Sequence, residues 1–203
     1  MRPRDELIKA AFRLECVTAG WLLVESAVAL WSGVAAHSLT LIAFGADSVI
    51  ELLSAGLLLW RLNVELRARE KFSEETERRA AKVGAALLIA LTTYVLAYGA
   101  WGLWRGEGQA FSLSGLILAV FAIPIMFALA KAKLNLANAI GSVSLRTDAA
   151  ESIACGYLSG VVLVGLLAQW AIGAWWVDGV SALALTPFLI NEAREAWEGD
   201  GDD

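Results

Sequence analysis

Long apolar stretches separated by short polar segments are the main pattern along the chain. Six of these stretches reach the roughly 20 residues that a helix needs to cross a bilayer. They cover residues 14–36, 39–60, 83–104, 111–130, 139–167 and 175–194. The long polar connection, 61–82, carries charges of both signs. The pattern predicts an all-α membrane protein, a bundle of six transmembrane helices.

Lysine and arginine residues fall almost entirely on one side of the predicted spans. Fifteen of the 16 lie in the N-terminal tail, in the 61–82 connection, or at Lys131, Lys133, Arg146 and Arg194. Lys131 and Lys133 are assigned to the connection after the fourth span, and Arg105 alone falls on the opposite side. Cytoplasmic loops are enriched in basic residues. The distribution therefore predicts that both termini are cytosolic.

Composition supports the membrane class. Hydrophobic residues make up 58% of the chain, whereas soluble domains contain about 45–50%. We expect a single transmembrane domain over residues 1–203 that ends in a short acidic tail, 195–203. The lipid bilayer is its expected surrounding, and no feature indicates binding to nucleic acid.

Acidic residues interrupt the predicted spans. At 1.5 Å per residue they lie about 13–19 Å from a span end, near the middle of a hydrocarbon core about 30 Å thick. Ionisable groups at this depth are costly and usually mark an ion path or a proton relay. These acids are Glu25, Asp47, Glu51, Asp148 and Glu151.

The spacing of these acids forms two sets. Asp47 and Glu51 are four residues apart, as are Glu151 and Cys155, and Asp148 lies one turn before Glu151. Each set therefore lies on one face of its helix, and two facing helices would offer anionic ligands to one divalent cation. Zn²⁺ accepts Asp, Glu and Cys, and Fe²⁺, Co²⁺ and Mn²⁺ accept similar donors in other proportions. The sequence does not decide the identity of the metal ion. It also does not decide which of Asp148, Glu151 and Cys155 are direct ligands.

Without a cation, such crowded carboxylates cannot all stay ionised, because they repel one another and burial removes their water. Metal binding would then release protons and metal loss would take them up, which predicts metal–proton exchange. We assign Glu25 and Arg146 to a proton relay or to the layer around the ligands. His37 and Asp178 are assigned to the outer mouth, with capping of the sixth helix, its own, as the alternative for Asp178. The alternative for the acids is helix packing through hydrogen bonds.

SLTL at 38–41 and DSVIE at 47–51, with Glu51 in place of a second Asp, resemble the S-x-x-L run and the D-x-x-x-D motif of the cation diffusion facilitator family of metal–proton antiporters. The match covers most of the chain. LRTDAAES at 145–152 is similar to L-R-A-D-A-x-H-S, in which the His and an Asp four residues later are ligands. Those two positions hold Glu151 and Cys155 here. WVDG at 176–179 resembles the W-x-D-P opening of helix six.

The resemblance implies a tetrahedral site between helices two and five, a homodimer, and alternating access that exports a divalent metal from the cytosol in exchange for protons. It implies no prosthetic group and no enzymatic activity. Zn²⁺ is the first expectation, with Fe²⁺, Co²⁺ and Mn²⁺ as alternatives. The chain looks most like a small, transmembrane-only branch without the family's C-terminal cytosolic domain, and we expect it in a prokaryotic inner membrane.

Two other functions remain open from the sequence. The first is a membrane protein that binds or senses a metal, or is structural, without transport. The second, which ranks lower, is an intramembrane aspartyl protease with Asp47 and Asp148 as its dyad.

Overall fold

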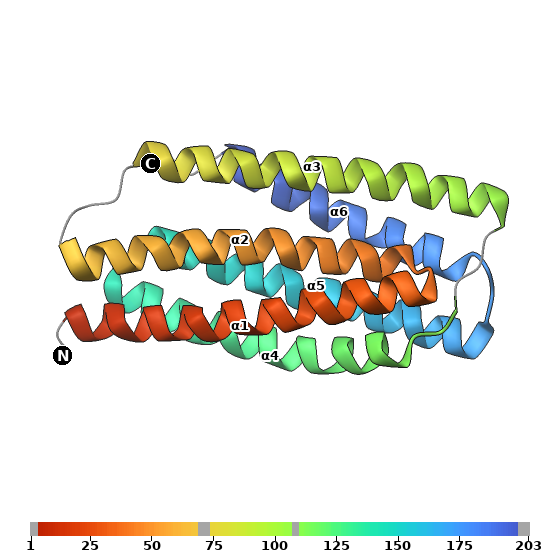
Figure 1. Ribbon diagram of the computed structural model, residues 1–203, viewed down its shortest axis with the longest axis horizontal. Coiled ribbons are helices and arrows are strands. Elements are labelled where there is room, and N and C mark those ends of the chain that lie inside the picture. The colour runs from red at the N-terminus through yellow and green to blue at the C-terminus, as the bar shows by residue number, and fades with distance from the viewer. Residues whose placement is uncertain (1–3, 69–73, 107–109, 199–203) are drawn as a thin grey trace.

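The computed structural model describes residues 4–68, 74–106 and 110–198 (Figure 1). Within these ranges it contains helices only, so the prediction of an all-α, six-helix bundle is confirmed. The centre of the predicted 61–82 connection and the end of the acidic tail lie outside the described residues. The helices are α1 (Arg4–Ala36), α2 (Leu39–Ala68), α3 (Glu74–Arg105), α4 (Leu113–Ile140), α5 (Val143–Ile172) and α6 (Val177–Glu198).

Helices α1 to α5 are long and apolar enough to cross a membrane. Helix α6 does not meet that standard; it has 22 residues and includes Asp178, Glu192 and Arg194. Large apolar side chains lie on the outer surface, with Trp31 at 77% and Trp104 at 80% exposure. A lipid environment accommodates such a surface, whereas soluble monomers rarely expose large apolar patches. The molecule is therefore an all-α membrane bundle.

Successive helices run in opposite directions along the bundle (Figure 1). The closest pairs are α1 with α2, α4 with α5, and α3 with α6. Further contacts of α1 with α4 and of α2 with α5 close a four-helix core, which α3 and α6 flank. Leu22, Phe44, Met126 and Leu158, one from each helix of the four, are buried in its centre.

The turn between α4 and α5 corrects two predictions. Gly141, at φ 72°, ends α4 and its N–H donates to the carbonyl of Ala137. Ser142 then accepts from the N–H of Leu145 at 3.3 Å and caps α5. The predicted fifth span, 139–167, therefore crosses this turn, and α5 itself runs from residue 143 to residue 172. Lys131 and Lys133, which the sequence analysis assigned to a connection, lie on helix α4.

Candidate functional site

The four-helix core buries most of the predicted site residues. Glu25 on α1, Asp47 and Glu51 on α2, and Asp148 and Cys155 on α5 are each at most 6% exposed. Glu151 on α5 is half-buried. Carboxylates from three helices thus lie inside a membrane bundle, where a charge without compensation is costly.

Glu25 forms one polar cluster. The hydroxyl of Ser48 donates to its Oε1 at 3.0 Å, and the thiol of Cys155 donates to the same oxygen at 3.2 Å. The indole N–H of Trp21 donates to Oε2. Glu25 therefore connects α1, α2 and α5. The thiol of Cys155 acts as a donor here, whereas a metal-binding cysteine is a thiolate.

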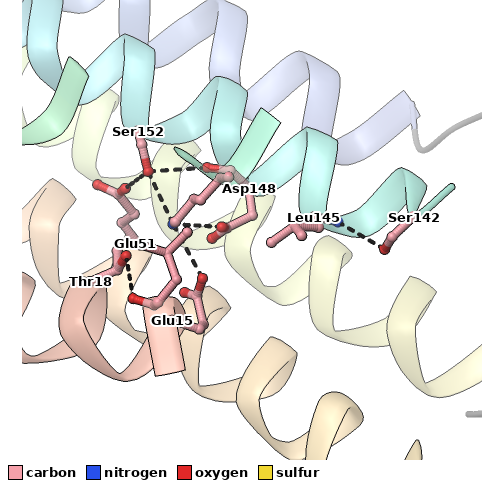
Figure 2. A network of polar contacts seen from close by, with 9 residues as sticks. Glu15, Thr18, Glu51, Ser142, Leu145, Asp148 and Ser152 are labelled. Carbon is pink, nitrogen blue, oxygen red and sulfur yellow. Dashed lines mark hydrogen bonds and ion pairs between the residues drawn. The ribbon is translucent and has the colours of Figure 1, made fainter. Parts of the chain in front are cut away.

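Lys133 forms a second cluster with residues of three other helices. Its Nζ lies 2.5 Å from Oδ2 of Asp148 and 3.4 Å from Oε2 of Glu15. It also donates to the hydroxyl of Ser152 at 3.2 Å, and that hydroxyl donates to Oε1 of Glu51 at 3.3 Å. Figure 2 shows Glu15, Glu51, Asp148 and Ser152 pointing toward one another. This cluster thus links α1, α2, α4 and α5.

The two clusters lie at different depths in the bundle. Glu15 and Glu25 are ten residues apart on α1, which is about 15 Å along a helix. Glu51 lies between the clusters, because its charged neighbours include both Lys133 and Glu25, together with Asp47 and Glu151. The buried polar groups therefore extend along the bundle rather than around a single point.

Sequence reasoning missed Lys133 and Glu15. A signal for Lys133 was present, because the buried positions of α4 recur at helical spacing and Lys133 falls among them. A charged residue on a buried helical face needs a partner of opposite charge. On α4, the buried positions near Lys133 are Met126, Leu129, Ala130 and Ala137. Glu15 gave no comparable signal, because it lies at the start of the first predicted span, outside the set of midplane acids.

The remaining predicted residues lie outside both clusters. Arg146 is exposed and donates to Oδ1 of Asn138 at 2.9 Å, so its described contact is not with the buried acids. His37 is exposed, with φ 55°, in the turn between α1 and α2. With Tyr98, Trp175 and Asp178 it lines a cavity of about 290 Å³.

Asp178 caps a helix other than its own. Its carboxylate accepts from the hydroxyl of Ser38 at 2.7 Å, from the N–H of Leu39 at 2.7 Å and from the N–H of Thr40 at 3.2 Å. These groups form the start of α2, whereas Asp178 belongs to α6. The sequence analysis considered capping of the sixth helix itself, whereas the described hydrogen bonds of the Asp178 carboxylate cap the start of α2.

Among the described residues, no three His, Cys, Asp or Glu side chains are arranged to hold a metal ion. Instead, Asp148 contacts Lys133, and Glu25 contacts Cys155. The core therefore brings together carboxylates and a thiol, which suit a divalent cation. In this structure, their described contacts are with other side chains of the protein. The ligand set stays a prediction.

The bundle and its buried acids define a multi-pass membrane protein with a charged interior. The family model of the cation efflux transmembrane domain matches residues 17–198. The chain thus belongs to the cation efflux family, the cation diffusion facilitators, which are transporters of divalent metal cations. The resemblance seen in the sequence is confirmed. No individually curated protein matches the chain.

Proposed function

We propose that the protein is a metal²⁺/H⁺ antiporter that exports Zn²⁺, Fe²⁺, Co²⁺ or Mn²⁺ from the cytosol. The observation that carries the proposal is the burial of Asp47 and Glu51 on α2 in the same four-helix core as Asp148 and Cys155 on α5. Helices α2 and α5 are in contact. Family membership supports the transport of divalent cations.

The proposed ligands are Asp47, Glu51, Asp148, Glu151 and Cys155. A divalent ion needs charged donors to replace its water, and Asp, Glu and thiolate serve that purpose. Because a thiol must lose its proton to bind metal, entry of the ion and departure of protons are coupled. The bundle then alternates between inward and outward openings around this region.

Glu25 suits the role of proton carrier. Its carboxylate accepts hydrogen bonds from Ser48 and Cys155. When Cys155 loses its proton to become a ligand, Glu25 is the acceptor already in contact with the sulfur. We further propose a homodimer in a prokaryotic inner membrane with both termini in the cytosol.

Metal flux into proteoliposomes under an imposed pH gradient tests the proposal. We would screen Zn²⁺, Fe²⁺, Co²⁺ and Mn²⁺ with wild type, Asp47→Asn and Glu6→Gln. Glu6 is an exposed acid on α1, so Glu6→Gln is a control that also removes one carboxylate. Wild type and Glu6→Gln should transport equally, and Asp47→Asn should lose at least about tenfold, as expected when a metal site is disrupted.

A binding measurement in detergent tests one alternative function, and the contacts of Asp148 bear on the other. Binding of metal in detergent with no flux in vesicles would replace the transporter with a binding or sensing protein. An aspartyl protease needs two carboxyl groups that share a proton. Among the described contacts of Asp148, the ion-paired partner is Lys133 and not Asp47, so the structure offers no support for the protease.

A further inference from the structure

Lys133 is an unusual residue for the interior of a membrane bundle. Its side chain is 0% exposed, although α4 belongs to the apolar helices. The acidic groups near its ammonium are Asp148, Glu15, Glu51 and Glu151, which come from α5, α1 and α2, and the hydroxyl of Ser152 is a further contact. Four carboxyl groups therefore lie near one ammonium group.

Stability alone is a weak reason to keep this arrangement. Replacing a buried ion pair by apolar residues of similar size is often neutral or stabilising. Beyond their ion pairs with Lys133, the carboxylate oxygens of Glu15 and of Asp148 have no hydrogen-bond partner among the described residues. Both carboxylates therefore depend on the same ammonium, which lies 3.4 Å from Glu15 and 2.5 Å from Asp148.

We propose that Lys133 is a tethered cation that competes with the transported metal for Asp148, and that Glu15 receives the ammonium when the metal binds. This inference rests on the proposed function. The ammonium now lies closer to Asp148, at 2.5 Å, than to Glu15, at 3.4 Å. Because a lysine side chain is flexible and has three donors, it can exchange one carboxylate for the other without a change in the backbone.

Ser152 connects the position of Lys133 to helix α2. Its hydroxyl accepts from Nζ of Lys133 and donates to Glu51. When the ammonium turns to Glu15, Asp148 loses its ion pair and becomes available to a cation, while the Ser152 hydroxyl can still donate to Glu51. Movement of one side chain thus frees one proposed ligand, Asp148 on α5, which Ser152 connects to Glu51 on α2.

Competition and simple packing give opposite expectations for metal affinity. If Lys133 competes, its removal strengthens metal binding, because the apparent dissociation constant is the intrinsic one divided by the fraction of molecules whose site is free of the ammonium. Removal of the Glu15 charge weakens metal binding, because the carboxylate that receives the ammonium is lost and the ammonium stays on Asp148. If Lys133 serves packing only, neither variant binds metal more tightly than wild type.

The test is calorimetric titration of the full chain in detergent with Zn²⁺, Fe²⁺, Co²⁺ and Mn²⁺. We expect Lys133→Gln to lower the dissociation constant about tenfold and Glu15→Gln to raise it. Lys131→Gln is the matched control, since Lys131 lies on the same helix two residues earlier and is exposed. Its dissociation constant should equal that of wild type.

Two further variants keep the test decisive if Lys133→Gln fails to fold. Glu15→Gln/Lys133→Gln leaves no unpaired charge at Glu15 and should also bind metal more tightly than wild type, whereas Lys133→Arg, which keeps the cation, should not. Metal binding by wild type without tighter binding in the double variant would overturn the competition alone. No binding of any of the four ions by wild type or variants would overturn the proposed function as well.

Discussion

At the scale of single residues, Asp178 shows how one carboxylate positions a distant helix. The first N–H groups of a helix have no partner within it, and Asp178 on α6 accepts from the N–H groups of Leu39 and Thr40 on α2. Helix α2 also carries Asp47 and Glu51. The contact therefore fixes the start of the helix that holds two of the proposed ligands.

Loss of this cap should destabilise the protein. We expect Asp178→Ala to cost about 0.5–2 kcal/mol of unfolding free energy, the range measured for helix caps. Asp178→Asn keeps one acceptor oxygen and should lose less. Thermal unfolding in detergent measures both. Equal stability of wild type and Asp178→Ala would show that the cap contributes little.

The same two variants separate capping from attraction of cations at the outer mouth. Asn removes the charge but keeps an acceptor, whereas Ala removes both. If Asp178 acts through capping, Asp178→Asn should keep metal flux close to that of wild type. A flux as low in Asp178→Asn as in Asp178→Ala, with normal stability, would favour the outer-mouth role.

The sequence predicts which residues of the site are buried acids, but it does not predict their contact partners. The acids were recognisable because a carboxylate is rare in a span of apolar residues, and the structure buries them. The hydrogen-bond and ion-pair partners of these acids were not recognisable. The contacts of Glu25 and the contact between Lys133 and Asp148 depend on how the four helices rotate and cross. Helical periodicity predicts which face of a helix a residue lies on, but it does not predict which residue of another helix lies opposite.

At the scale of elements, α1 and α2 approach closely through two glycines. A Cβ at Gly33 would lie 2.8 Å from the backbone nitrogen of Ile42, and a Cβ at Gly45 would lie 2.9 Å from that of Leu30. Backbone atoms cannot rotate away as a side chain can. Small residues let membrane helices pack at short distances, and here they hold the α1–α2 pair together.

Alanine at these positions should force the two helices apart. We expect Gly33→Ala and Gly45→Ala each to cost about 1–3 kcal/mol, as overpacking does. Gly20→Ala on α1 and Gly56→Ala on α2 are matched controls, because a Cβ at either position meets nothing within 4 Å. Thermal unfolding of the four variants provides the comparison, and equal loss in all four would refute the role of close approach.

The elements themselves were largely predictable. Apolar length located every helix, but the ends differ for physical reasons. Helix α1 begins at residue 4 rather than near 14, because charged residues on an exposed helical face do not end a helix. The predicted fifth span did not include a break at Gly141 and Ser142, although a glycine followed by a serine is a signal for the end of one helix and the start of the next.

At the scale of the whole molecule, the helices alternate so that α1 begins and α6 ends at the same end of the bundle (Figure 1). This arrangement bears on α6, which is less apolar than the other helices. If α6 crosses the membrane, the two termini lie on one side. If only α1 to α5 cross, the termini lie on opposite sides.

Reporter fusions in a bacterial host decide between these topologies. Green fluorescent protein fluoresces in the cytosol, and alkaline phosphatase is active outside the inner membrane. Because basic residues favour the cytosolic side and α6 packs along α3 and α5, we expect a reporter after residue 203 to show fluorescence and no phosphatase activity. A matched fusion after Gly173, which ends α5, should show the reverse. Phosphatase activity at both positions would mean that α6 does not cross the membrane.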